Sequence, residues 1–238
     1  ITMYLRFFGR EAGFGYEHTS AYFTTKYKDL VIIDLPVSTF QKLKNSQNPK
    51  LKDHFIYVLI THTHPDNVNG LGLFIHYADN VLDKKITIIA PSSKVGFDLR
   101  ELLKIHGVAD RWYNLQLAPD FLDKKWFIQA IPTPHCPELE GKCFGYKLSI
   151  DDTTIIYTGD TCDLNPFLPH IKANSILYVD VSVKPSLKHL MLGNIFNELI
   201  SLSKKSKCIY LMHLDDAQSA YNMVQNCPKI KIVDIWPC

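Results

Sequence analysis

The sequence predicts an α/β protein in which short apolar strands alternate with amphipathic helices. Two observations lead to this expectation. Apolar segments such as 55–60 and 208–212 recur along the chain, and segments with helical periodicity such as 95–105 follow or separate them. Several of the strands also end directly in a histidine or an aspartate. Because loops at strand ends converge in sheet-based α/β folds, this pattern predicts one shared functional site.

Composition supports a globular chain and excludes several classes of function. Of 238 residues, 46% are hydrophobic and 21% are charged, which is ordinary for a folded domain with an ample core. The net charge of +2 predicts no strong attraction to nucleic acid or to an anionic membrane. The six cysteines form no C-x-x-C pair, so we expect free thiols in a reducing compartment. We see no apolar run near the ~20 residues of a membrane span and no signal peptide, and therefore expect a cytoplasmic protein.

The pattern divides into two halves, approximately 1–118 and 119–238, within a single domain. Strands are rich in β-branched and aromatic residues, and turns contain glycine, proline or paired aspartates, as at Asp151 and Asp152. In the first half we expect strands at 3–8, 20–24, 30–33, 55–60 and 86–89, and helices at 40–43, 71–78 and 95–105. In the second half we expect strands at 126–131, 144–150, 154–157, 175–179 and 208–212, and helices at 195–202 and 217–224.

The strand at 55–60 ends in the chain's strongest functional motif. His62, His64 and Asp66 alternate after it, which places them on one side if the extended direction persists. Imidazole and carboxylate groups in a tight turn are typical ligands of a borderline divalent metal. The alternative is a surface turn that is rich in histidine by chance.

Other strands end in residues of the same types. These are Asp34, His135, Asp160, Asp180 and His213. Repetition at so many strand ends favours a shared site over coincidence. Asp34 has two interpretations of equal weight, a helix cap or a carboxylate that faces the site.

These residues resemble the metallo-β-lactamase superfamily, whose signature is H-x-H-x-D-H followed by a His, an Asp and a final His. The residues that match are His62, His64, Asp66, His135, Asp160 and His213. The resemblance implies a four-layer αββα sandwich of two mixed β-sheets flanked by helices. Within the superfamily the chain is most similar to the ribonuclease Z and phosphodiesterase-like branch.

The resemblance also implies a chemistry. Two divalent metal ions are expected, with zinc first and manganese or iron as alternatives, and Asp34 would support the site without binding metal. A metal-activated hydroxide would attack the substrate, Asp66 would orient it and accept its proton, and His189 paired with Asp180 would protonate the leaving group. The most favoured function is a phosphodiesterase for a small-molecule or nucleotide-type substrate.

One departure from the signature keeps other functions open. Asn67 stands where the family has its last motif histidine, and an amide oxygen is a weak ligand for zinc. The second metal site is therefore uncertain. A hydrolase of a thioester or lactone, or a metal-binding relative without turnover, remain as alternatives. The long insertion with which ribonuclease Z holds tRNA is missing, which counts against tRNA maturation. Many relatives form dimers, so a homodimer is possible here.

The expected rims of the site are the loops 9–18 and 136–142. In the first of them Phe14, Tyr16 and His18 either contact substrate or, as is commoner, pack on their own domain.

Overall fold

The computed structural model describes residues 4–121 and 124–236. The chain forms two compact units. One comprises the chain up to Phe121 together with the segment from Asp234 onwards, and the other extends to Val233. Each unit contains a mixed six-stranded sheet.

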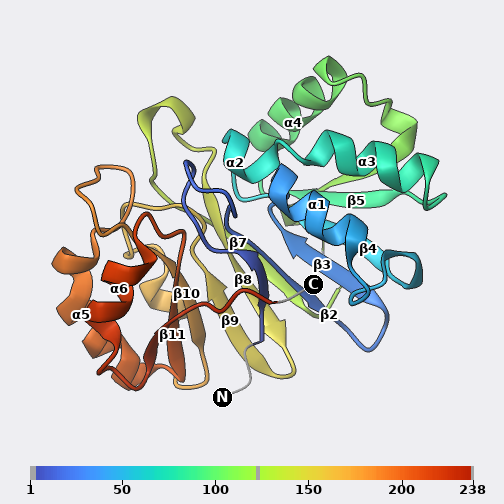
Figure 1. The fold of residues 1–238 in the computed structure, drawn as a ribbon. Coiled ribbons are helices and arrows are strands. Elements are labelled where there is room, and N and C mark those ends of the chain that lie inside the picture. Colours follow the sequence, from blue (N-terminus) through green and yellow to red (C-terminus); the bar gives the residue numbers. More distant parts are fainter. Residues whose placement is uncertain (1–3, 122–123, 237–238) are drawn as a thin grey trace. The chain divides into compact units, whose positions relative to one another are not determined.

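The sheet of the first unit follows chain order. Its strands are β1 (Arg6–Gly9), β2 (Ser20–Thr24), β3 (Asp29–Ile33), β4 (Phe55–Leu59), β5 (Ile86–Ala90) and β6 (Tyr113–Leu117). The strands from β1 to β3 pair antiparallel, and those from β3 to β6 pair parallel. The helices are α1 (Val37–Asn45), α2 (Pro65–Val68), α3 (Leu71–Asn80) and α4 (Ser93–Ile105). Figure 1 shows α1 and α3 side by side in this unit.

The sheet of the second unit repeats this arrangement. Its strands are β7 (Phe127–Pro132), β8 (Phe144–Ile150), β9 (Thr153–Tyr157), β10 (Ile176–Asp180), β11 (Cys208–Met212) and β12 (Ile230–Ile232). Again two antiparallel pairings precede three parallel ones. Figure 1 shows α5 (Leu192–Lys205) and α6 (Ala217–Val224) beside this sheet, and both contact its outer strands.

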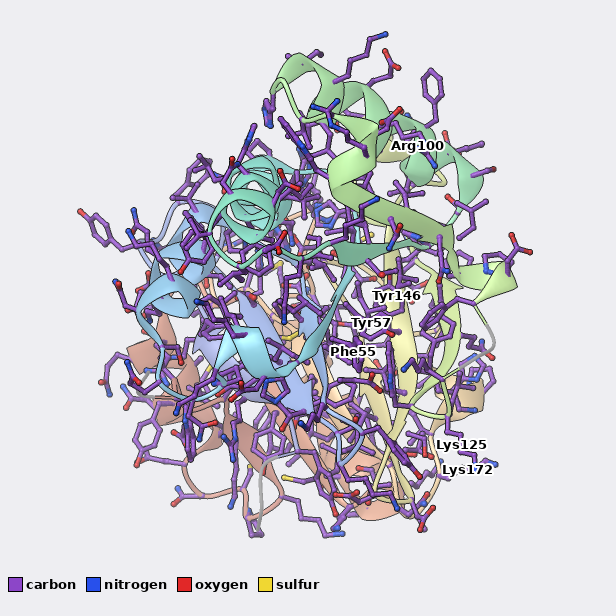
Figure 2. The ribbon with its side chains drawn as sticks, turned by 90° about the vertical axis from the view of Figure 1, so that its right-hand side faces the viewer. Phe55, Tyr57, Arg100, Lys125, Tyr146 and Lys172 are labelled. Atoms are coloured by element: carbon purple, nitrogen blue, oxygen red, sulfur yellow. The ribbon has the colours of Figure 1, made fainter. Side chains whose placement is uncertain are left out.

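Apolar packing holds the strand ends in place. In the first unit all five residues of β3 are buried. In Figure 2, Phe55 and Tyr57 follow one another along β4, and the ring of Tyr57 lies 6.0 Å from that of Phe121. In the second unit one cluster joins β10 and β11 to both helices, as fits a parallel sheet that a helical layer covers.

Most predicted elements are present, with small differences at their ends. Helix α1 is longer than predicted and begins at Val37, directly after Pro36. The prediction missed β6 and β12, each of which is one of the two edge strands of its sheet. Met3, in the first predicted strand, lies outside the described residues. Over the described ranges, no helix has the length and apolar character that crossing a membrane requires.

Candidate metal centre

The turn after β4 fixes the tautomer of His62. The hydroxyl of Thr61 donates to Oδ2 of Asp34 at 2.7 Å and lies 3.0 Å from Nδ1 of His62. The carboxylate accepts only, so the hydroxyl proton goes to Asp34 and Nδ1 of His62 donates to the hydroxyl. Nε2 of His62 then carries a lone pair, and it lies 3.0 Å from Nδ1 of His64. Two imidazole nitrogens this close suit one shared cation.

Asp34 supports this turn and does not cap a helix. Its Oδ1 accepts the backbone N–H of Thr61 at 2.8 Å, and its Oδ2 accepts Nδ2 of Asn67 at 3.0 Å. The residue before α1 is Pro36, so the helix-cap interpretation is wrong. Because β3 and β4 are parallel neighbours, Asp34 and the histidine turn meet at one edge of the sheet.

Asp66 and Asn67 lie on the short helix α2 that follows His64. Asn67 is buried, and its amide nitrogen is used by Asp34. Its Oδ1 is buried with no hydrogen-bond partner among the described residues. This oxygen is the one atom that Asn67 offers to a ligand.

In the second unit, His135 is oriented by a backbone carbonyl. Its Nδ1 lies 2.8 Å from the carbonyl oxygen of Lys188. Since a carbonyl can only accept, Nδ1 carries the proton and Nε2 carries the lone pair that could bind a cation. That Nε2 lies 3.9 Å from Oδ2 of Asp160.

Asp160, Asp180 and His213 meet because β9, β10 and β11 are parallel neighbours whose carboxyl ends share one edge. Nε2 of His213 lies 3.3 Å from Oδ2 of Asp160, and its Nδ1 lies 3.2 Å from Oδ1 of Asp180. The ligand atoms of Asp160, His189 and His213 lie within 4.8 Å of one another. The loops at the carboxyl ends of these three strands therefore present a compact group that can hold a cation.

Asp180 also holds His189. Its Oδ2 lies 2.8 Å from Nδ1 of His189. Burial alone would raise the pKa of the Asp180 carboxyl, but its hydrogen bond with His189 and the neighbouring imidazole of His213 hold that pKa at about 2. Burial would likewise lower the pKa of His189, but Asp180 raises it above its ordinary value. The pair therefore favours a charged His189 whose Nε2 remains available as a proton donor.

The residues present fit a divalent metal. The three histidines His62, His135 and His213 share one arrangement, in which Nδ1 faces an oxygen atom and Nε2 faces another ligand-type side chain. Metal-binding histidines in proteins are held in this way. The second donors, Asp66 and Asp160, are carboxylates that suit zinc, manganese or iron.

A cavity of about 550 Å³ opens beside His135. Its wall consists of the segment 132–137 with Cys143, Cys162, Leu187 and other residues of the second unit. Burial raises the pKa of the Cys143 thiol to about 12, so this side chain is uncharged at neutral pH. The volume is typical of a pocket for a small organic ligand. It adjoins the predicted rim 136–142.

The predicted site residues therefore gather in two sets. The turn after β4 in the first unit carries His62, His64, Asp66 and Asn67. The second unit brings together His135, Asp160, Asp180, His189 and His213. Sequence reasoning missed the hydroxyl of Thr61 and the carbonyl of Lys188. A threonine next to His62 could have been recognised in the sequence as a hydrogen-bond partner of that histidine. The carbonyl of Lys188 could not, because every residue has a backbone carbonyl.

Comparison with known proteins identifies a family and a fold. A family model described as Anti-Pycsar protein Apyc1 matches residues 3–234. No curated protein sequence matches the chain.

Solved structures share the fold at low identity. The metallo-β-lactamase fold protein YhfI from Bacillus subtilis has a TM-score of 0.76 at 15% identity, with 98% of each chain covered. Zn²⁺-bound PqqB from Methylobacterium extorquens has a TM-score of 0.73 at 11% identity, with 99% of each chain covered. A diphosphatase from the PhnP family has a TM-score of 0.72 at 16% identity, with 98% of this chain and 95% of that chain covered. The predicted fold class, two mixed sheets flanked by helices, is confirmed.

Proposed function

Because the chain belongs to the Anti-Pycsar protein Apyc1 family, we propose that it is a metal-dependent phosphodiesterase that opens the phosphodiester of a cyclic nucleotide. The family's description points to degradation of a cyclic nucleotide signal. The near-neutral charge agrees with a small substrate rather than a long nucleic acid.

The ligands divide between two cations in this proposal. His62, His64 and His135 would hold the first, and Asp66, Asp160 and His213 would hold the second, with Asn67 as a weak further ligand. When bound, the two ions supply an acidic water and stabilise the charge that grows on the phosphoryl oxygens. Zinc is the first expectation for both positions, and manganese or iron also suit these donors.

The chain's own residues then handle the protons. Asp66 orients the attacking water and accepts its proton. His189 donates from Nε2 to the oxygen that leaves, since its Nδ1 is bound to Asp180 at 2.8 Å. Opening a cyclic nucleotide expels a ribose alkoxide, which is a poor leaving group that needs a proton.

The pairing of His189 with Asp180 is the observation that carries the proposal. A thioester releases a thiolate, which needs no such donor, so the pair favours a phosphodiester over that alternative. The cavity beside His135 is large enough for a molecule of nucleotide size.

Turnover by the purified full chain tests the proposal. With manganese or zinc supplied, we expect hydrolysis of 3′,5′-cyclic nucleotides and of bis(p-nitrophenyl) phosphate. The control is His64→Ala with its metal content measured. Equal rates for the two proteins, with metal shown bound to the wild type, would falsify the proposal.

Asn67 favours a second candidate, a protein that binds the cyclic nucleotide without turning it over. Asn67 offers a cation only its amide oxygen, which is a weaker ligand for zinc than the imidazole of the family signature. Titration calorimetry with a cyclic nucleotide distinguishes the two. Binding without any product favours this candidate, whereas product formation favours the enzyme.

A further inference from the structure

The loop between β1 and β2 displays two aromatic rings to solvent. Phe14 is 109% exposed and Tyr16 is 93% exposed. The expectation that these rings pack on their own domain is therefore wrong, whereas His18 does contact its own loop, with Nε2 3.3 Å from the carbonyl of Gly13. Large rings left this open on a folded loop require an explanation.

Hydrogen bonds hold this loop in one shape. The Glu11 carboxylate accepts the backbone N–H groups of Tyr16 at 2.6 Å and Glu17 at 2.8 Å. The N–H of Gly15 donates to the carbonyl of Ala12 at 2.8 Å. The ring positions are thus ordered before any ligand arrives, which lowers the entropy cost of binding.

The same loop passes against a predicted catalytic residue. A Cβ atom added at Gly13 would lie 3.1 Å from Oδ2 of Asp66. Gly13 directly precedes Phe14, so the backbone that carries the exposed rings passes, within the first unit, beside the carboxylate that would serve the reaction.

We propose that Phe14 and Tyr16 form a stacking subsite for the nucleobase of the cyclic nucleotide. This inference rests on the function proposed above. Every base has a flat π face, so an aromatic platform binds a base without reading its hydrogen-bonding edge. The subsite would raise affinity for the nucleotide while discriminating weakly among bases, with larger bases stacking better.

Substrates with and without a base test this subsite. For Phe14→Ala and Tyr16→Ala we expect the KM for a cyclic nucleotide to rise about tenfold with little change in kcat. The KM for 1-deoxyribose 3′,5′-cyclic phosphate, which has no base, should not change. Tyr16→Phe keeps the ring and should retain wild-type KM. Matched controls are Phe97→Ala and Tyr27→Ala, two exposed aromatics on other segments of the same unit.

Each other outcome has a distinct meaning. No rise in KM, or an equal rise for both substrates, overturns the subsite. If the equal rise accompanies a change from dimer to monomer by light scattering, the rings contact a second copy of this chain instead. If the wild type hydrolyses nothing, the proposed function fails, and calorimetric titration of the cyclic nucleotide into wild type and Phe14→Ala then decides the subsite alone.

A second inference comes from the loop between β10 and α5 in the other unit. This loop supplies both the carbonyl of Lys188, which orients His135, and the side chain of His189. Its end is tied to its start, because the N–H of Ser182 donates to the carbonyl of Leu190 at 2.8 Å.

Asp215 fixes the start of that loop. Its Oδ1 accepts the N–H of Val183 at 2.8 Å, and its Oδ2 accepts the N–H of Lys184 at 2.9 Å. The hydroxyl of Ser182 lies 2.8 Å from the same Oδ2. The geometry assigns Asp215 as a positioning residue for His189 and His135. Asp215 acts on these two histidines indirectly. It holds the loop that carries His189 and that supplies the carbonyl which orients His135.

Asp215→Asn tests this assignment with little change in volume. Either amide orientation sets an NH₂ group against a backbone N–H. We expect kcat for a cyclic nucleotide to fall about tenfold or more, and kcat for bis(p-nitrophenyl) phosphate to fall much less, because p-nitrophenolate leaves without a proton. Asp216→Asn is the matched control, since that neighbouring carboxylate only caps α6 through Ser219.

Equal losses on both substrates at unchanged metal content, or equal losses in the two variants, overturn this assignment. Failure of the wild type on both substrates contradicts the proposed function instead. Imidazole NMR spectra then decide the role of Asp215, since loss of its clamp should shift the Nδ1–H signals of His135 and His189 while Asp216→Asn leaves them unchanged.

Discussion

Oδ2 of Asp180 lies 2.8 Å from Nδ1 of His189, and the aspartate is completely buried. The second oxygen of the same carboxylate lies 3.2 Å from Nδ1 of His213. One buried charge therefore fixes two imidazoles, one that we propose as a proton donor and one as a metal ligand. Such a carboxylate sets both the tautomer and the pKa of its partners.

Asp180→Asn should move the basic limb of the pH profile to lower pH. Asp180 raises the pKa of His189, and a general acid loses activity as the pH rises through its pKa. Removing the negative charge lowers that pKa, so activity on a cyclic nucleotide is lost at lower pH. The measurement is kcat against pH at matched metal content. Basic limbs at the same pH in both proteins contradict the role of His189 as the acid.

His189→Ala should keep its metal and lose turnover. General acids contribute roughly 10²- to 10⁴-fold to a rate, so we expect a loss in that range for a cyclic nucleotide. His189 also lies within reach of a cation that Asp160 and His213 would share. Metal analysis of the dialysed variant separates these roles, because loss of one ion per chain would make His189 a ligand.

Asn67→His should strengthen the second metal site. An imidazole nitrogen is a better ligand for zinc than the single free amide oxygen of Asn67. We expect the wild type to bind its second ion more weakly than its first, and the variant to bind both tightly in a calorimetric titration with zinc. Asn69→His places the same residue at the exposed end of α2 and should leave the stoichiometry unchanged. If both variants bind zinc as the wild type does, position 67 contributes no ligand.

Asp34→Ala should destabilise the metal-free protein by about 3 kcal/mol, because it leaves buried donors of Thr61 and Asn67 without their acceptor. Urea unfolding measures the change. Asp34 has a φ of 57°, and an alanine in this left-handed conformation adds backbone strain to the loss of stability. Asp83→Ala controls for that part, since Asp83 is exposed with a φ of 52°. Equal losses in the two variants would show that the hydrogen bonds contribute nothing.

The sequence predicted the strands that carry the site because their apolar runs are short, buried and sharply ended. Cys208–Met212 and Phe144–Ile150 agree with the prediction to the residue. The two missed strands, β6 and β12, are edge strands. In β6 polar Asn114 and Gln116 alternate with apolar residues, which is a weak signal beside the continuous runs of the central strands.

The motif residues were predictable, whereas the contacts that orient them were not. His135 is oriented by a carbonyl 53 residues away in the sequence, and every residue type offers a carbonyl. Asp215 is one of two consecutive aspartates, and only the fold shows that one holds a loop while the other caps α6. The repeated sheet topology was also invisible, since a buried strand needs apolar residues but no particular sequence.

The route of the chain constrains the order in which the protein can be completed during synthesis. After β12 the chain returns to the first unit, where the N–H of Trp236 donates to the carbonyl of Phe7 at 2.8 Å and the guanidinium of Arg6 lies 4.3 Å from the Trp236 ring. A ribosome produces β1 early and its partner Trp236 only after the whole second unit. Until then β1 lacks part of its packing in the nascent chain. This exposed edge strand is therefore the segment that a chaperone would bind or that would pair with a misfolded neighbour.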